Sequence, residues 1–575
     1  MTKTISEPES LTLGTTLPPG DPHGVSVSLP KWADTVGWAS REPRVLEAMK
    51  TGYPRFFVPR VVDKLATRLL ERQQTALGLG TDNTSSTTRV MLLDSIRHAR
   101  MCQKVLPEWN LQREHTGPVD TGAHVVTWEG EMTAVEQQRN ATGEPRRTRN
   151  IGEEDIVLLT FPADLALEAK AFWQHTGFGI SSRRATFWLD NAPFLTSPRI
   201  PKPPVSPAER ENQLRHARAA LKTGIAAGQS SGADNLNVTP SDVFLFSTGM
   251  TAIAETAAAI MTLRQGNPSS PYRVAVFGFL YVDTYKVLSR VLGYEPTQYH
   301  STASSLAALE EYLETNRIDA LVTEFPGNPL LQSPDLARLR DLSRRPDRGF
   351  VLVVDDTVGT HANLALLPHC NVVCTSLTKM YCGACNAMGG TVTLSPHSAY
   401  HDRLAGALER RKHEAERSWF WEDMLVVEMN GRDFCDRVHR AGENAEVVVA
   451  MLRRSGAVAE VYYPLGGPTQ NRYDQFRKKG GGYGYLVSIK FRRPAQAVAF
   501  YDALDVAKGP SLGTNFTLCC AYTLLAHYKE LEWAAEYGVV EHLVRISVGL
   551  EDREWLEERV QRALKVTENI KEDKG

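Results

Sequence analysis

Two residues in the middle of the chain could carry out chemistry together. Asp355 follows the apolar run 350–354, and Lys379 comes shortly after the run 371–375. A lysine amine forms a Schiff base with an aldehyde, and a carboxylate holds a pyridine nitrogen protonated so that the ring accepts electrons. The pair therefore indicates pyridoxal phosphate chemistry. Taken alone, such a pair is more often a buried ion pair or a surface lysine. Other motifs in the chain are needed to distinguish a cofactor site from these alternatives.

The composition is that of a globular protein without a strongly charged partner. Of 575 residues, 42% are hydrophobic and 23% are charged, and the formal net charge is −2. A net charge this close to zero gives no electrostatic reason to expect nucleic acid or an anionic membrane as a binding partner. No apolar run approaches the roughly 20 residues that span a bilayer, and the N-terminus lacks a signal pattern. Together with only eight cysteines, these features predict a cytoplasmic protein.

One pair of cysteines has the spacing of a CxxC motif. Cys382 and Cys385 lack the second pair that a structural zinc site needs, and they do not follow the first strand of a thioredoxin-like unit. We therefore expect no metal, and we expect the two residues to line the cofactor pocket.

Changes in composition and hydrophobic period divide the chain into four parts. Residues 1–75 begin as a Pro/Gly-rich arm, and 76–225 hold strands and helices between polar loops. In 226–437 apolar strands alternate with helices, which predicts a mostly parallel sheet covered on both faces. Residues 438–575 predict a smaller α/β domain. Strands are expected at 88–93, 124–128, 155–161, 243–246, 273–277, 320–323, 350–354, 371–375, 459–463 and 484–491.

Further candidate ligands stand where the strands of 226–437 end. Because ligands of open α/β sheets bind beyond the carboxyl ends of strands, these side chains are expected to face one crevice. Amides at a helix start suit a phosphate dianion, as do hydroxyls, and an aromatic ring stacks on a flat cofactor. Core packing for the tyrosine and turn formation for the asparagine are the alternatives. The candidates are Gly249, Met250, Tyr281, Asn328, Ser376 and Thr378.

The order of these motifs resembles that of one enzyme family. The chain is similar to the pyridoxal phosphate enzymes of cysteine and methionine metabolism, whose stretches read S-G-M, Y-G-G-T-Y, N-P, V-D-N-T and S-A-T-K. Its own motifs are Gly249-Met250, Tyr281, Asn328-Pro329, Asp355-Asp356-Thr357 and Ser376-Leu377-Thr378-Lys379, followed by Ser511-Leu512-Gly513 and the tail 543–552. Within the family, 22–30, 49–57 and 172–177 look most like fungal cystathionine γ-synthases.

The resemblance implies a fold and an assembly. The large domain at 226–437 would have the aspartate-aminotransferase-like architecture of fold type I, followed by the small α/β domain at 438–575. The α+β block at 76–225 would be an addition of unknown role. Residues 1–75 would be an arm and inter-subunit clamp, because Tyr53 and Arg55 match a Y-x-R that reaches the neighbouring subunit's phosphate site. A homodimer or homotetramer with shared active sites is therefore expected.

The resemblance also implies a role for each site residue. Lys379 and Tyr281 would be catalytic, with Lys379 as the Schiff-base lysine and Tyr281 stacked on the ring. The residues implied to bind the cofactor are Gly249, Met250, Tyr281, Asn328, Asp355, Ser376, Thr378, Lys379, Tyr53 and Arg55. Those implied to bind the substrate are Arg545, for the α-carboxylate, and Ser511.

The implied reaction is a γ-substitution on O-acetyl- or O-succinyl-homoserine through a vinylglycine-type intermediate. The default nucleophile is the thiol of cysteine, which gives cystathionine. Asp356 replaces the family's usual asparagine, and 380–390 departs from the sequence associated with the housekeeping fungal enzyme. A carbon nucleophile such as a β-keto acid enolate, in a specialised pathway, therefore stays open, as does a γ-lyase. A cofactor-free scaffold is the non-enzymatic alternative.

Overall fold

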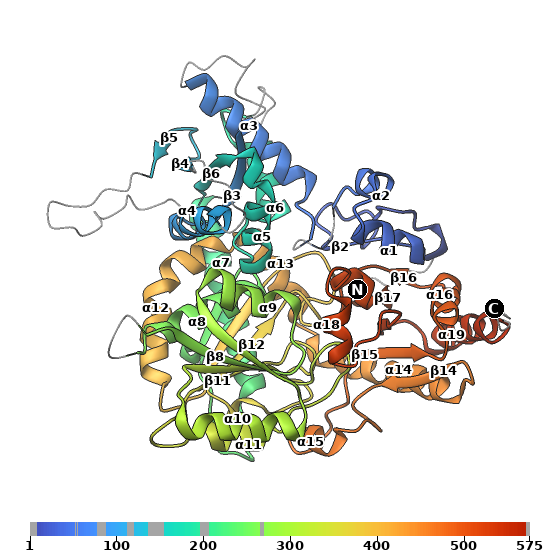
Figure 1. Cartoon of the computed structure of the whole chain (residues 1–575). Coiled ribbons are helices and arrows are strands. Elements are labelled where there is room, and N and C mark those ends of the chain that lie inside the picture. Colours follow the sequence, from blue (N-terminus) through green and yellow to red (C-terminus); the bar gives the residue numbers. More distant parts are fainter. Residues whose placement is uncertain are drawn as a thin grey trace.

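The computed structural model describes residues 8–51, 53, 56–76, 88–111, 120–135, 154–195, 206–264 and 270–570. Its elements form four sheets with the helices that cover them (Figure 1). The largest sheet lies in the centre of the molecule, the N-terminal block lies above it in the view of Figure 1, and the C-terminal sheet lies beside it.

The central sheet has seven strands in the order β7-β13-β12-β11-β10-β8-β9. All neighbours are parallel except β13, which runs antiparallel to β12 and β7. This confirms the predicted α/β fold with a mostly parallel sheet. The strands are β7 (Val243–Phe246), β8 (Tyr272–Phe277), β9 (Tyr294–Tyr299), β10 (Ala320–Glu324), β11 (Val351–Asp355), β12 (Val372–Ser376) and β13 (Gly390–Leu394).

Both faces of this sheet are buried, because successive strand residues enter two different cores. Leu321 and Leu352 join the core under α10 and α11, whereas Val322 and Val353 join the core under α8 and α12. Continuous apolar strands are typical of a sheet covered on both sides. The covering helices are α7 (Pro207–Gln229), α8 (Gly249–Met261), α9 (Val282–Lys286, continued by a π-helical turn at Val287–Val291), α10 (Ala303–Thr315), α11 (Leu336–Ser343), α12 (His401–Ser418) and α13 (Trp421–Gly431).

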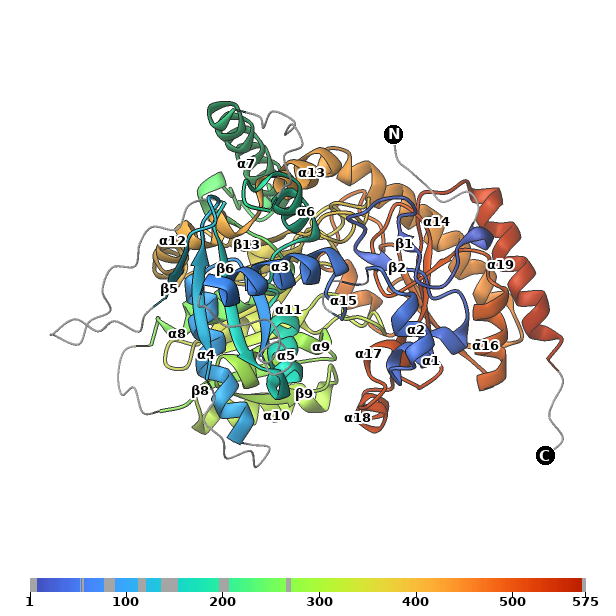
Figure 2. The same ribbon diagram turned by 90° about the horizontal axis from the view of Figure 1, so that it is seen from above.

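The N-terminal block is built on a four-stranded antiparallel sheet of order β3-β6-β4-β5. One face of that sheet shares a core with α8, and the other packs under α3 and α6. Figure 2 shows the block lying over the central sheet. Its elements are α3 (Arg60–Ala76), β3 (Thr88–Leu93), α4 (Ile96–Leu111), β4 (Gly122–Val126), β5 (Met132–Ala134), β6 (Ile156–Pro162), α5 (Ala166–Thr176) and α6 (Ser182–Asn191).

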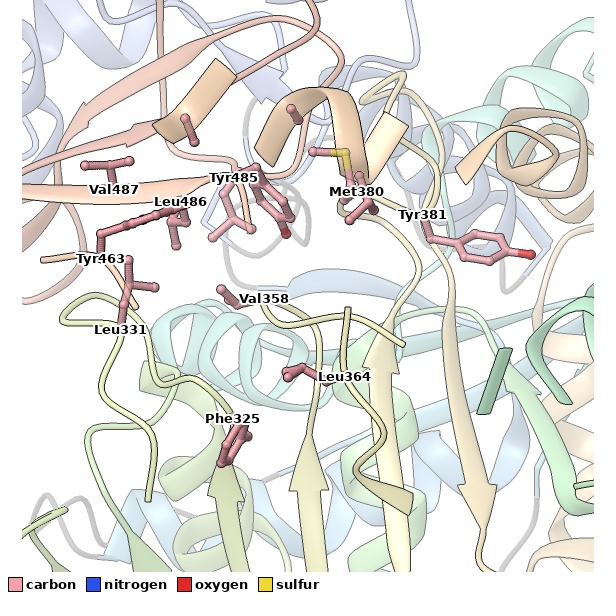
Figure 3. Close-up of a cluster of buried hydrophobic side chains, with 14 of the residues drawn as sticks. Phe325, Leu331, Val358, Leu364, Met380, Tyr381, Tyr463, Tyr485, Leu486 and Val487 are labelled. Atoms are coloured by element: carbon pink, nitrogen blue, oxygen red, sulfur yellow. The ribbon is translucent and has the colours of Figure 1, made fainter. Parts of the chain in front are cut away.

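The C-terminal region has a five-stranded sheet of order β14-β15-β18-β17-β16. Tyr485 packs beside Val358 where this sheet meets the ends of the central strands (Figure 3), and its hydroxyl donates to the carbonyl of Thr357 at 3.3 Å. The elements are α14 (Phe434–Arg454), β14 (Val458–Tyr462), α15 (Gln470–Asp474), β15 (Leu486–Phe491), α16 (Pro494–Ala503), β16 (Ala507–Lys508), β17 (Leu518–Ala521), α17 (Tyr522–Ala526), α18 (Leu531–Glu536), β18 (Val544–Ser547) and α19 (Arg553–Glu568).

The N-terminal arm packs on this small domain. The amide of Trp32 donates to Asp502 Oδ1 at 2.7 Å, and that of Leu29 donates to the carbonyl of Lys508 at 2.9 Å. The arm contains β1 (Thr16–Leu17), β2 (Ser26–Val27), α1 (Trp32–Ala39) and α2 (Pro43–Ala48).

Each of the ten strands expected from the sequence is present, with ends shifted by no more than two residues. The antiparallel strand β13 was not expected. The predicted limits at 225 and 437 fall inside the continuous helices α7 and α14, and the four-part division itself stays a prediction. None of the described helices is long and apolar enough to cross a membrane.

Candidate active site

A pocket opens at the carboxyl ends of the central strands, where the small domain covers them. It is lined by ten of the twelve site residues expected from the sequence, which are Tyr53, Gly249, Met250, Tyr281, Asn328, Asp355, Ser376, Thr378, Lys379 and Arg545. These residues come from seven separate parts of the chain. The carboxyl ends of neighbouring parallel strands lie at one sheet edge, which is why they meet.

Lys379 lies in the turn after β12, and it is 93% buried. Its Nζ donates to the hydroxyl of Tyr53 at 2.8 Å and lies 4.3 Å from the centre of that ring. The structure therefore places Tyr53 in the pocket of its own chain, and the expected reach into a neighbouring subunit stays a prediction. Arg55 lies outside the described residues.

Asp355 is the last residue of β11, and its Oδ1 accepts a hydrogen bond from the amide of Thr357 at 2.9 Å. Removal from bulk water raises the pKa of this carboxyl, although the Thr357 hydrogen bonds and the charge of Lys379 oppose the rise. A carboxylate in such a place stays ionised only beside a positive charge. A protonated ring nitrogen would supply that charge.

The start of α8 provides a cradle for a phosphate. Thr248 caps the helix by accepting from the amide of Thr251 at 3.0 Å, which leaves the amides of the first turn facing the pocket. A Cβ on Gly249 would lie 2.6 Å from Cβ of Ser376. Glycine is thus required for the two segments to approach this closely. Thr378 lines the same pocket, and its hydroxyl donates to the carbonyl of Gly389 at 3.3 Å. The start of α8, with Ser376 beside it, fits a phosphate dianion.

Glu324 is a residue of the pocket that the sequence reasoning missed, although it stands in the turn that contains Asn328. It is the last residue of β10 and the register partner of Asp355. Its Oε1 accepts from the amide of Tyr281 at 2.5 Å, and its Oε2 accepts from the amide of Asn328 at 3.1 Å. Burial and the neighbouring Asp355 raise the pKa of this carboxyl. One carboxylate therefore fixes the backbone of both residues expected to flank the ring.

Arg545 lies on β18 and points its guanidinium across the pocket. Nη1 donates to Oδ1 of Asn328 at 3.2 Å, and Nη2 donates to the carbonyl of Ser511 at 3.0 Å. Its Cζ lies 4.9 Å from the ring centre of Tyr522. A guanidinium fixed in this way can bind a substrate carboxylate with its remaining donors.

Two expectations about the pocket wall are wrong. Ser511 does not line the pocket, because its neighbours Pro510 and Leu512 face the cavity while its own carbonyl holds Arg545. Cys382 and Cys385 do not line it either, since the thiol of Cys382 turns away toward the side chain of Asn430. Within the described ranges, no group of three or more His, Cys, Asp or Glu side chains could hold a metal ion.

Asp356 is buried behind the pocket, where the family usually has asparagine. Its Oδ1 accepts from the hydroxyl of Thr375, and its Oδ2 accepts from Nε2 of Gln229 at 3.0 Å. Burial raises the pKa of Asp356 to about 7, and the negative charge of Asp355 adds to the rise. The protonated form resembles the amide of asparagine, which explains how the substitution is tolerated.

Comparisons with known proteins agree with this geometry. Residues 236–565 match the family described as "Cys/Met metabolism PLP-dependent enzyme", and residues 61–181 match the "Fungal trans-sulfuration enzyme, N-terminal domain". The second match covers most of the block that the sequence marked as an addition, and it confirms its fungal character.

Full-length relatives give the same result. The chain is 33% identical to "Cystathionine gamma-synthase" of Neurospora crassa, over 97% of this chain and 98% of the relative. It is also 33% identical to "Cystathionine gamma-synthase-like enzyme iboG2" of Amanita muscaria, over 98% of each. The crystal structure of cystathionine gamma synthase from Xanthomonas oryzae has the same fold, with a TM-score of 0.52 and 22% identity over 62% of this chain and 87% of that one. The chain therefore belongs to the Cys/Met metabolism family of PLP-dependent enzymes, and its cofactor is pyridoxal phosphate.

Proposed function

We propose that the enzyme catalyses γ-substitution on an O-acylated homoserine, with Lys379 and Asp355 at opposite ends of the bound cofactor. One observation carries the proposal. Lys379, Asp355, the start of α8 and Arg545 line the same pocket, although they lie far apart in the sequence. Together they match an amine, a ring-nitrogen partner, a phosphate cradle and a carboxylate anchor.

The bound cofactor supplies an electron sink for the substrate's Cα. Lys379 would hold the cofactor through its aldehyde, and its amine would move protons at Cα and then at Cβ of the substrate. The hydroxyl of Tyr53, 2.8 Å from Nζ, orients the amine for this transfer. Asp355 would keep the ring nitrogen charged, while Gly249, Met250, Ser376 and Thr378 would hold the phosphate.

Arg545 binds the substrate α-carboxylate, and Asn328 fixes the orientation of its guanidinium. Met388, Leu512 and Leu525 line the same pocket and offer apolar surface to the rest of the substrate. Either an acetyl or a succinyl group is compatible with the proposal.

The default nucleophile is the thiol of cysteine, with cystathionine as the product. This choice of nucleophile is supported by a relative named cystathionine gamma-synthase, which is 33% identical to this chain over nearly the whole length of both. A second candidate is a carbon nucleophile, such as a β-keto acid enolate. The apolar wall of Met388, Leu512, Leu525 and Ala526 favours it, because such a surface suits an alkyl substituent better than a second zwitterion. A γ-lyase that eliminates without adding a nucleophile is a third.

The test is to incubate the purified enzyme with O-acetyl- and O-succinyl-homoserine, each with cysteine, other thiols, β-keto acids or no acceptor. Formation of cystathionine only when cysteine is present supports the default. A new carbon–carbon bond identifies the second candidate, and keto acid without acceptor identifies the lyase. Lys379→Ala should abolish turnover with every acceptor. Normal turnover in that variant would refute the proposal.

A further inference from the structure

The N-terminal block touches the two helices that begin at the pocket, α8 and α9. In both views α5 lies beside α9, and the block covers the outer side of α8 (Figures 1 and 2). The first turn of α8 forms the phosphate cradle, and Tyr281 immediately precedes α9. The block therefore stands where it can set the position of both.

The first link joins the end of α5 to the start of α9. Nδ1 of His175 donates to Oδ1 of Asp283 at 2.8 Å, and Nε2 of Gln174 donates to the same oxygen at 3.3 Å. Asp283 is completely buried and lies two residues after Tyr281. A buried carboxylate held by two donors from another part of the chain resists displacement.

A second link reaches the first turn of α8. The hydroxyl of Thr251 lies 3.4 Å from the carbonyl of Thr176 and 3.3 Å from that of Gly177, at the end of α5. The amide of Thr251 is the one capped by Thr248. The same short segment of the block therefore contacts both helix starts.

The third link is a buried charge network on the next turn of α8. Glu255 is 1% exposed, and its carboxylate accepts from Nη2 of Arg97 at 2.6 Å and lies 3.1 Å from Nε2 of His98. Nδ1 of His98 donates in turn to Oδ1 of Asp94 at 2.5 Å. The His98 ring stacks on the ring of Phe178, and the two ring centres lie 3.5 Å apart. Arg411 on α12 also donates to this carboxylate, at 3.3 Å. Because a buried carboxylate needs charged partners, α8 relies on the block and on α12 together for the balance of its charge.

The block also docks on α13, through residues that do not line the pocket. Arg183 and Ser181 both donate to the carboxylate of Asp423 on α13, and none of the three lines the pocket. If the block served only for packing or assembly, breaking its contacts to α8 and α9 or breaking its contacts to Asp423 would change the Kd for pyridoxal phosphate equally. This contrast provides the control.

We propose that the N-terminal block is a buttress for the cofactor site. Through His175, Thr251 and Glu255 it fixes the starts of α8 and α9, and so the positions of the phosphate cradle and of Tyr281. His175 is a positioning residue, because it touches neither cofactor nor substrate and acts through Asp283. The inference rests on the proposed roles of Gly249, Met250 and Tyr281.

The experiment compares three variants of the full-length enzyme, each stripped of cofactor and titrated with pyridoxal phosphate by absorbance. His175→Leu removes the donor to Asp283 and should raise the Kd for pyridoxal phosphate by about ten-fold, the typical cost of a lost hydrogen bond to a charged group. His175→Asn places an amide nitrogen near the position of Nδ1 and should restore the Kd to within about two-fold of the wild type. Asp423→Asn should lower the Tm and leave the Kd unchanged.

The buttress is refuted if His175→Leu binds pyridoxal phosphate like the wild type, or if Asp423→Asn raises the Kd equally. Should His175→Leu fail to fold, Gln174→Leu takes its place, since it removes the other donor from α5 to the same oxygen of Asp283. The proposed function fails separately, if the wild type binds pyridoxal phosphate and Lys379→Ala retains full turnover.

Discussion

Glu324 and Asp355 are register partners at the ends of β10 and β11, so two carboxylates stand side by side at the edge of the pocket. They have different tasks. Asp355 is the proposed partner of the ring nitrogen, whereas both oxygens of Glu324 accept from backbone amides, those of Tyr281 and Asn328. Glu324 thereby joins the residue proposed to stack on the ring to the partner of Arg545.

Glu324→Gln should weaken cofactor binding. Glutamine offers one acceptor oxygen where two amides need one each, so a buried N–H is left unsatisfied, which costs about 1–3 kcal/mol. The Kd for pyridoxal phosphate, measured by absorbance titration, should rise by about 5- to 150-fold. Glu428→Gln is the matched control, because Glu428 pairs with the exposed Arg432 at the end of α13 and does not line the pocket. An unchanged Kd in Glu324→Gln would contradict the positioning role.

Gly249→Ala should damage the phosphate cradle. The added Cβ would lie 2.6 Å from Cβ of Ser376, and overpacking of this kind costs about 1–3 kcal/mol. Loss of cofactor on dialysis is the measurement. Gly224→Ala on α7, where a Cβ meets nothing within 4 Å, should leave cofactor retention unchanged and stabilise the helix by about 0.5–1 kcal/mol. Equal cofactor retention in both variants would show that Gly249 is not part of the phosphate cradle.

Arg545→Lys should impair substrate binding more than cofactor binding. Lysine keeps the charge but cannot hold Asn328, the Ser511 carbonyl and a carboxylate at once, so KM for the amino-acid substrate should rise by about 10- to 100-fold. The Kd for pyridoxal phosphate should change little. Arg553→Lys, on the exposed face of α19, controls for the substitution type. A normal KM would show that another group binds the carboxylate.

Asp356→Asn should change the pH dependence of stability. The folded-state pKa of Asp356 is raised from 3.8 to about 7, so between these values the folded protein binds the proton more tightly than the unfolded chain does. The proton on Asp356 therefore stabilises the folded state. This contribution to the free energy of unfolding is fully present below about pH 4 and is lost as the pH rises through 7. Asparagine mimics the protonated form at every pH. The Tm of Asp356→Asn relative to the wild type should therefore be higher at pH 8 than at pH 5, and an equal difference at both pH values would refute the raised pKa.

The sequence by itself determined the cofactor and most of the pocket. Lys379, Asp355 and Gly249 each follow an apolar strand, and parallel strands all end at one edge of a sheet, so strand-end residues converge whatever the loops do. The strands were predictable for the same reason, because burial on both faces leaves a continuous apolar run.

Only the tertiary structure decided what the loops and the N-terminal block contribute. Ser511 is buried beside the pocket and contributes its carbonyl to Arg545, while Gly513, with φ of +65°, lies against the backbone of Lys379 and Met380. Glu324 and His175 act through partners 43 and 108 positions away in the chain. Such contacts depend on how separately formed elements pack, and no local pattern of residue types encodes that packing.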